Sequence, residues 1–147
     1  MELKSQLESS LKDAMRAGDD VRKRTLRMVL SAVRLEEIDK RAQMDDAGVI
    51  AVLQKEVKSR HEAIADAQRA HRPDLESETQ AEIVVLESFL PKALTQDELE
   101  ALAKEAIAET GAASIKEMGT VMKVLMPRLQ GRASGDQASQ AVRKLLS

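Results

Sequence analysis

The sequence predicts an all-α protein, and three observations support this. Aliphatic residues recur at intervals of three and four through most of the 147 residues, which is the period of amphipathic helices. The alternating β-branched and aromatic runs typical of strands are absent. The chain has one Phe and no Trp or Tyr, so its core must consist of aliphatic side chains and Met, which suits helix packing. We expect an N-terminal four-helix domain followed by a small C-terminal three-helix domain.

The N-terminal domain begins with two amphipathic helices. The first is expected over 2–17, where Gly18 ends it. Asp19 or Asp20 caps the second, which runs to about Ala42. The expected buried positions of this pair are Leu3, Leu7, Leu11, Ala14, Met15, Leu26, Val29, Leu30 and Val33, with Ile38 as an extension of the second helix's face.

The third and fourth helices of this domain are separated by a proline. Asp45 or Asp46 caps a long third helix that ends near His71. Pro73 disfavours helical geometry in the residue before it but suits the first position of a fourth helix, expected through Phe89. The expected buried positions are Val49, Ile50, Leu53, Val57, Ile64, Ile83, Leu86 and Phe89.

The boundary between the two predicted domains, 1–90 and 91–147, lies at the sequence Leu90-Pro91-Lys92. After it, the pattern T-x-x-E at 95–98 is a capping box, which begins a helix that Gly111 ends. The expected buried positions of this helix are Leu99, Leu102, Ala103, Ala106 and Ile107.

Two further helices are expected in the C-terminal domain. A second capping box at 114–117 begins the first of them, and Pro127 marks a break. A basic turn flanked by glycines follows at 131–135, and Ser134 or Asp136 caps the last helix. The expected buried positions are Met118, Val121, Met122, Leu125, Met126, Val142, Leu145 and Leu146.

Composition excludes several classes of protein. A net charge of -2 argues against a wholly electrostatic nucleic-acid binder. The absence of Cys removes disulfides and thiolate metal sites, and the lack of Trp and Tyr argues against base-stacking platforms. The N-terminus lacks the apolar region of a signal peptide, and no apolar run approaches the roughly 20 residues that span a bilayer. We expect a cytoplasmic, bacterial protein with no membrane partner.

No catalytic or metal-binding constellation is recognisable. His61-Glu62 would need a second histidine at the position of Ala65 to form a zinc-protease motif, and His71 lies too far along the helix. The segment 131–135 lacks the Lys-Ser/Thr ending of a phosphate-binding loop. We therefore expect no catalytic residues, no metal and no cofactor.

The methionines and the helical glycine of the segment 115–135 each allow two interpretations. Met118, Met122 and Met126 recur every four residues, which predicts core filling or, alternatively, a groove for a partner. Gly119 lies inside a predicted helix, where glycine costs about 1 kcal/mol relative to alanine. Either a neighbouring helix or the backbone of a ligand approaches it closely.

Positive charge gathers near the C-terminus. Arg132, beside the start of the last helix, is a candidate phosphate contact, because helix amides and a guanidinium both bind phosphate. A second basic cluster, Arg22-Lys23-Arg24 with Arg27, begins the second helix and either binds a partner or pairs with Asp19 and Asp20. From Gly111 onward only Glu117 and Asp136 oppose a set of basic residues, namely Lys116, Lys123, Arg128, Arg132, Arg143 and Lys144.

The chain resembles the GatB/YqeY family, specifically its free-standing YqeY type. Four stretches carry the resemblance: DDVRKRTLRMVLSAV, VIAVLQKEVKSR, AEIVVLESFLPKALTQDELEALAKEAIAETGA and KEMGTVMKVLMPRLQGRASG. It implies a helical domain joined to a three-helix domain like the tail of the tRNA-dependent amidotransferase B subunit, which helps to hold misacylated tRNA. Ser134 departs from the acidic residue frequent at this position. The implied functional positions are Lys116, Gly119, Met122, Lys123, Gly131, Arg132 and Ala133.

These observations predict a non-catalytic accessory module that binds tRNA. The chain lacks the amidotransferase's catalytic domain, so a carbon–nitrogen ligase activity with glutamine as amide donor would need amidotransferase subunits as partners. A protein–protein adaptor is the third hypothesis. The expected nucleic-acid-binding residues are Lys116, Gly119, Lys123, Arg128 and Arg132.

Overall fold

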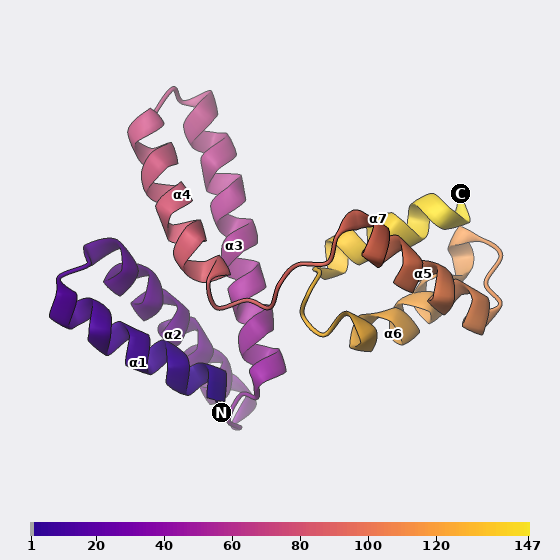
Figure 1. Cartoon of the computed structure of the whole chain (residues 1–147), viewed down its shortest axis with the longest axis horizontal. Helices are drawn as coiled ribbons and strands as arrows, with labels where there is room; N and C mark the ends of the chain where they lie inside the picture. The colour runs from indigo at the N-terminus through magenta and orange to yellow at the C-terminus, as the bar shows by residue number, and fades with distance from the viewer. Residues whose placement is uncertain (1) are drawn as a thin grey trace. The chain divides into compact units, whose positions relative to one another are not determined.

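The computed structural model describes residues 2–147, and the prediction of an all-α protein is confirmed, because the described residues form helices and no strands. Figure 1 shows the chain as a series of helices, with an extended connection between α4 and α5. The helices are α1 (Glu2–Ala17), α2 (Asp20–Lys40), α3 (Asp46–Arg69), α4 (Pro73–Glu87), α5 (Gln96–Thr110), the 3₁₀ turn η1 (Ile115–Glu117), α6 (Met118–Leu129) and α7 (Gly135–Leu146).

Contacts divide the chain into two compact units, an N-terminal unit that ends at Leu90 and a C-terminal unit that begins at Pro91. The first contains α1 to α4 and the second contains α5 to α7. Each unit has its own aliphatic core. That each unit is a domain able to fold by itself stays a prediction.

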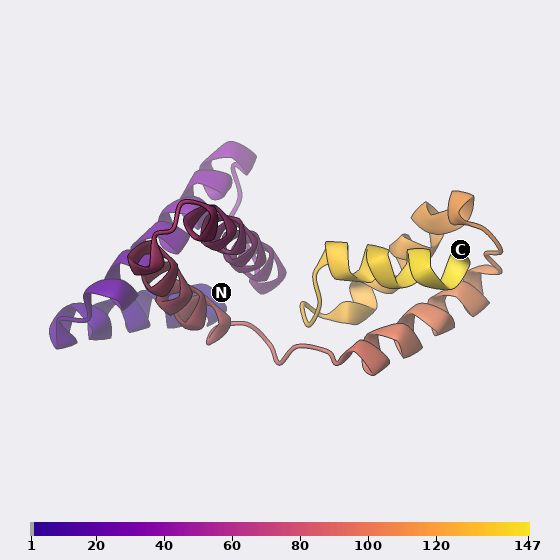
Figure 2. The same ribbon diagram turned by 90° about the horizontal axis from the view of Figure 1, so that it is seen from above.

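The N-terminal unit consists of two helical hairpins, α1–α2 and α3–α4, as Figures 1 and 2 show. Its core includes Leu7, Leu26, Val29, Leu53 and Leu86, which are fully buried. These residues come from all four helices, so burial of their aliphatic side chains holds the hairpins together.

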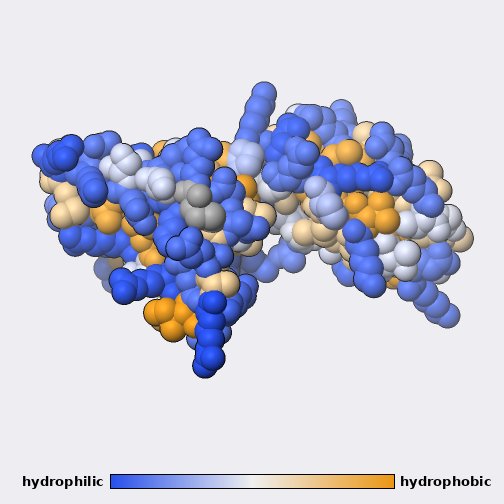
Figure 3. Space-filling model, turned by 90° about the horizontal axis from the view of Figure 1, so that it is seen from below, coloured by the Kyte–Doolittle hydropathy of each residue, from blue (hydrophilic) through white to orange (hydrophobic). Residues whose placement is uncertain are grey.

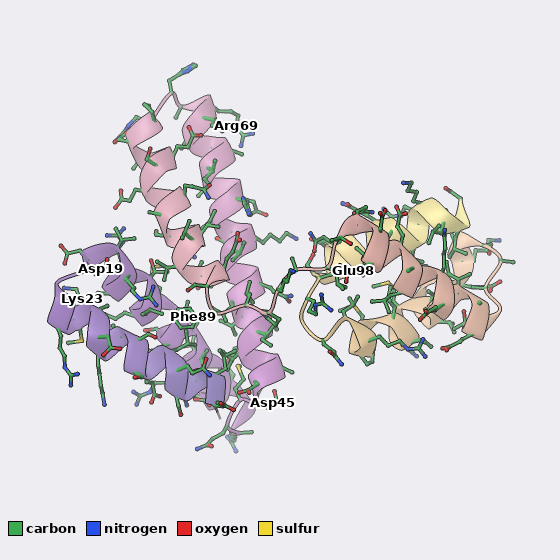
Figure 4. The ribbon with its side chains drawn as sticks, viewed as in Figure 1. Asp19, Lys23, Asp45, Arg69, Phe89 and Glu98 are labelled. Atoms are coloured by element: carbon green, nitrogen blue, oxygen red, sulfur yellow. The ribbon has the colours of Figure 1, made fainter. Side chains whose placement is uncertain are left out.

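Local hydrogen bonds define where these helices begin and end. Asp19 and Asp45 are the N-caps of α2 and α3, and each carboxylate accepts a backbone N–H bond, at 3.1 and 2.9 Å (Figure 4). The sequence left Asp20 and Asp46 as alternatives, and both lie in the first turn instead. Helix α2 ends two residues before the expected Ala42, because Arg41 adopts a left-handed conformation with φ of 52°.

Three of the four residues in the basic cluster at the start of α2 have partners within the N-terminal unit, and Arg27 is the exception among the described contacts. Lys23 Nζ lies 3.4 Å from an Asp20 carboxylate oxygen, which agrees with the pairing interpretation. Arg24 instead pairs with Glu78 on α4, at 3.0 Å. The guanidinium carbon of Arg22 lies 5.4 Å from the centroid of the ring of the single Phe, residue 89, within range of a cation–π contact.

A buried arginine joins α3 to α4. Arg60 is only 6% exposed, and its guanidinium lies 3.1 Å from Glu56 and 3.7 Å from Glu82. Arg60 Nε and Glu82 Oε2 are buried without a hydrogen bond of normal geometry. Both carboxylates are largely buried, so removal of Arg60 would leave them without their common cation.

In the C-terminal unit α5, α6 and α7 pack against one another in pairs. Small buried residues, including Ala103, Ala106, Ala138 and Ala141, alternate in the core with Leu125 and other larger aliphatic side chains. The capping box of Thr95 and Glu98 is confirmed, as is the end of α5 at Gly111, whose φ is 68°.

Two sequence predictions in this unit are wrong. The expected capping box at 114–117 does not form, because the Ser114 side chain caps nothing and the Glu117 carboxylate accepts the N–H of Ala113 instead. A short 3₁₀ turn takes its place. Pro127 does not break α6, which continues to Leu129. The carbonyl of Lys123, which loses its usual i+4 donor to the proline, belongs to an exposed residue, so water can satisfy it.

Candidate functional site

The exposed side of η1 and α6 brings together three of the five expected binding residues. Gly119 and Lys123 are one helical turn apart and therefore neighbours on the surface of α6. Lys116 precedes them in η1, and all three residues are exposed. We call Lys116, Gly119 and Lys123 the α6 edge.

The two lysines of the α6 edge have no acidic partner within the described part of the chain. Arg128, Arg132 and Lys144 of the same unit do have one: Lys144, for example, lies 3.3 Å from Glu100 on α5. A lysine without a partner keeps its three N–H donors for solvent or for an external anion. The α6 edge is therefore a locally uncompensated positive surface.

Gly119 has no structural explanation in the fold. Its φ is not positive, unlike those of Gly18, Gly111 and Gly131. A Cβ added at this position would meet nothing within 4 Å apart from its own helix. The expected close approach of a neighbouring helix is therefore wrong, and the alternative interpretation, close approach by a ligand, remains.

Arg128 belongs to a different side of α6 and has a partner. Its guanidinium forms a short hydrogen-bonded ion pair with Glu109 of α5. That hydrogen bond raises the pKa of Arg128 above its usual value. Because this contact joins α6 to α5, Arg128 has an evident structural role.

Arg132 holds the start of the C-terminal unit against the turn before α7. Its Nε donates to the Lys92 carbonyl at 2.9 Å, and its own carbonyl accepts from Leu94 N at 2.9 Å. The guanidinium also lies 3.5 Å from Glu98, which Figure 4 labels at the start of α5. Hydrogen bonds from Thr95 are the main cause of the lowered pKa of Glu98, and Arg132 adds to it.

The N-terminus of α7 offers an anion fewer free donors than the sequence predicts. Ser134 is the N-cap, and its Oγ accepts the N–H of Gln137 at 3.1 Å. The Gln137 side chain in turn accepts the N–H of Ser134 at 3.0 Å. The carboxylate of Asp136 lies in the same first turn, where it repels an incoming phosphate. The geometry therefore favours the α6 edge over this helix terminus as an anion site.

The methionines divide between core and surface. Met118 and Met122 are half-buried and pack against the core of the C-terminal unit, as the core-filling interpretation predicts. Met126 is exposed, and so is Ile115. Met126 lies three residues after Lys123 and is therefore its neighbour on α6, whereas Ile115 adjoins Lys116 along the chain.

A second surface feature was missed in the sequence. An open depression of about 380 Å³ in the N-terminal unit is lined by Lys4 of α1 and by Arg34, Glu37, Ile38 and Arg41 at the end of α2, with two loop residues. Glu37 accepts from Lys4 Nζ at 2.8 Å and from the N–H of Met44 at 2.9 Å. The Lys4 hydrogen bond is the largest cause of its lowered pKa. Only folding brings Lys4 to this place.

Two other features are absent from the described residues, a cluster of metal ligands and a membrane-spanning helix. In residues 2–147 no three His, Asp or Glu side chains are placed to share a metal ion. No helix in the same part of the chain combines the length and apolarity needed to cross a bilayer.

The chain is similar to a known protein family. Residues 4–146 match the YqeY family, described as Yqey-like protein. Curated relatives include the proteins named "Altered inheritance of mitochondria protein 41, mitochondrial" from three fungi. The Kluyveromyces lactis protein is 37% identical over 84 residues, which are 56% of this chain and 45% of that protein.

The Vanderwaltozyma polyspora protein is 32% identical over 57% of this chain and 46% of its own length. The Pyrenophora tritici-repentis protein is 28% identical over 86% of this chain and 71% of its own length. The chain thus spans about half the length of several curated relatives that it matches. Because the family match extends over nearly all of the sequence, this chain belongs to the YqeY-like protein family.

Proposed function

We propose that the protein is an RNA-binding accessory module, with tRNA as the expected ligand, and that the α6 edge contacts the sugar–phosphate backbone. The observation that carries this proposal is the unexplained Gly119 beside Lys123, with Lys116 on the same exposed side. The resemblance to the amidotransferase tail, which helps to hold tRNA, supports tRNA rather than another RNA.

The chemistry of the edge suits a phosphate backbone. A glycine leaves the helix surface bare, so a strand of RNA can approach it more closely than it could approach any other residue. Two lysines without partners can then bind phosphates without first breaking an ion pair. The absence of Trp and Tyr fits contacts to the backbone better than stacking on bases.

Arg128 and Arg132 contribute less in this proposal than the lysines do. Each would have to exchange a carboxylate, of Glu109 or Glu98, for a phosphate. The binding free energy gained by such an exchange is smaller than the one gained when an unpaired lysine binds a phosphate, because the charge of the arginine is already compensated in the free protein.

Filter binding to total tRNA tests the proposal. The Lys116→Ala/Lys123→Ala variant should bind more weakly than wild type, and the slope of log affinity against log salt should fall by about 1.5 in magnitude. Lys104→Ala, which removes an exposed lysine from α5, is the control and should change little. An absence of tRNA binding at low salt, or equal effects of the two variants, would contradict the proposal.

A protein–protein adaptor is the second candidate, favoured by the exposed Met126 and Ile115 beside the α6 edge. An accessory role in glutamine-dependent amide transfer, with amidotransferase subunits supplying the catalysis, is one form of it. Pull-down with and without nuclease separates the hypotheses, because a protein-only complex survives nuclease. An amidation assay with and without the protein then tests for an effect on rate.

The compartment stays a prediction. The sequence favours a cytoplasmic protein, whereas the names of the fungal relatives place those proteins in mitochondria. Fractionation of the source cells with an antibody against the chain would decide between the two.

A further inference from the structure

The exposed side of α2 carries a regular row of arginines. Arg27, Arg34 and Arg41 follow one another at seven-residue intervals. Seven residues turn a helix through about 700°, only about 20° short of two full turns, and advance it by about 10.5 Å. Arg27 and Arg34 therefore lie on one side of α2. Arg41, the left-handed residue that ends the helix, lines the same depression as Arg34, and all three arginines are exposed.

None of these arginines is neutralised within the described part of the chain. Two nearby carboxylates are already engaged. Glu36 pairs with Lys40 at 3.5 Å, and Glu37 holds Lys4 and the N–H of Met44. The helical period places Glu36 on another side of α2, whereas Glu37 lines the depression beside Arg34 and Arg41 and is already bonded to Lys4. The carboxylate beside the row is thus paired with Lys4, and the arginines keep their N–H donors for an external anion.

Large apolar side chains lie in and beside the row. Ile38 is 64% exposed and lies between Arg34 and Arg41, while Leu35 is 66% exposed and lies to one side. Met28, about half exposed, precedes Leu35 by seven residues. We call this surface the α2 outer face, and its residues are Arg27, Met28, Arg34, Leu35, Ile38 and Arg41.

One end of the α2 outer face is hollowed. Arg34, Ile38 and Arg41 line the depression of about 380 Å³ described above. Figure 3, a view of one side of the molecule, illustrates how apolar patches on the N-terminal unit are surrounded by hydrophilic atoms. Its lining combines the apolar side chain of Ile38 with three cations and the carboxylate of Glu37, which Lys4 engages, and this suits a ligand that is itself part apolar and part anionic.

We propose that the α2 outer face docks an amphipathic helix of a partner protein, with an apolar stripe flanked by Asp or Glu residues. A helix repeats its side chains every seven residues, so its carboxylates can match the spacing of the arginines. Its apolar stripe covers Leu35 and Ile38. The charge complementarity determines which amphipathic helices are accepted.

Two other occupants fit less well. An RNA backbone offers phosphates to the arginines but nothing apolar to Leu35 and Ile38. An anionic membrane would match both properties, but the face has no aromatic anchor, and the single Phe lies under Arg22 instead. The proposal concerns the N-terminal unit and does not depend on RNA binding by the C-terminal unit.

A synthetic peptide provides a direct test with the full chain. The probe is a 24-residue helical peptide, a length chosen to match about three heptads, with Leu at the a and d positions and Glu at e and g. Isothermal titration should show binding of this peptide and none of the same peptide with Lys in place of Glu. The Arg34→Glu/Arg41→Glu variant should lose at least tenfold in affinity, because like charges would then oppose each other.

The controls separate charge from apolar contact. Lys12→Glu on α1 reverses an exposed charge of the same unit and should leave peptide binding unchanged. Leu35→Ser/Ile38→Ser should weaken binding without reducing its salt dependence. Circular dichroism checks that each variant keeps the helix content of wild type.

Several results would overturn the proposal. One is a failure of the Glu peptide to bind at millimolar concentration, and another is equal binding of both peptides. A third is that Arg34→Glu/Arg41→Glu abolishes binding to tRNA or to anionic vesicles while peptide binding is absent, which would assign the face to those ligands. Self-association that the same variant abolishes, without peptide binding, would assign it to a second copy of the chain.

Discussion

Replacement of Gly119 by alanine should stabilise the protein and weaken its binding to RNA at the same time. The new methyl group enters open space, so the folded state suffers no clash. Alanine also restricts the unfolded chain and favours the helix, which together stabilise by about 0.5–1 kcal/mol. For a chain of this size that corresponds to a rise in Tm of about 2–3 °C.

The assay combines two measurements on the same preparations. Urea unfolding followed by far-UV circular dichroism gives the free energy of unfolding, and filter binding gives the affinity for total tRNA. If a phosphate backbone approaches Gly119 closely, the methyl group lowers that affinity although the protein has become more stable. Loss of binding therefore cannot be attributed to unfolding.

Gly111→Ala is the matched control, because it makes the same change in the same unit. Gly111 has a φ of 68°, a conformation that costs an L-residue about 1 kcal/mol or more, so this variant should be destabilised with little direct effect on RNA binding. A destabilised Gly119→Ala would show that the helix surface there is not open. A stabilised Gly119→Ala with undiminished tRNA affinity would refute Gly119 as an approach point.

Three further predictions concern the N-terminal unit. Gly48→Ala should destabilise by about 1 kcal/mol in urea unfolding, because the new Cβ would lie 2.4 Å from Cγ of the buried Met44 and must displace it. Arg60→Ala should lower the free energy of unfolding by about 3 kcal/mol in the same assay, because Glu56 and Glu82 lose their buried cation. Glu37→Gln should destabilise the protein at neutral pH, with the difference from wild type fading as the pH falls through the folded-state pKa of Glu37, since that pKa is held below its usual 4.5.

Each of these predictions has an outcome that would contradict it. A Gly48→Ala variant as stable as wild type would mean that the Met44 side chain moves aside without loss. If Arg60→Met kept the stability that Arg60→Ala loses, lost packing and not the carboxylates would explain the effect. A neutral Arg60→Ala would remove the argument altogether. Glu37→Gln destabilised equally at pH 3 and pH 7 would show that charge is not involved.

The sequence predicted the helices better than it predicted their contacts. Capping by Asp19, Asp45 and Thr95 was predictable, because these caps act within four residues of the chain. The prediction of a break at Pro127 was wrong, since a proline near the end of a helix removes a hydrogen bond that water can replace. Local sequence rules could not show whether tertiary packing would end the helix at Pro127 or let it continue to Leu129.

The candidate site was predictable only in part. The positions of Lys116, Gly119 and Lys123 on one side follow from the helical period, which the sequence provides. The ion pair between Arg128 and Glu109, and the contact of Arg132 with Lys92, join residues far apart in the chain. Such pairings depend on how the helices pack. The sequence therefore suggested five equivalent binding residues, whereas the structure shows that Arg128 and Arg132 have internal partners and the three residues of the α6 edge do not.

Because its cores are aliphatic, the protein has almost no intrinsic fluorescence of its own. With no Trp or Tyr in the sequence, one introduced indole would be the sole strong emitter. Placed at Leu102, which packs against the core of the C-terminal unit, it would register the melting of that unit alone. At Leu30, beside the other core, it would register the N-terminal unit. Coincident or separate melting curves would then reveal whether the two halves of the chain are thermodynamically coupled.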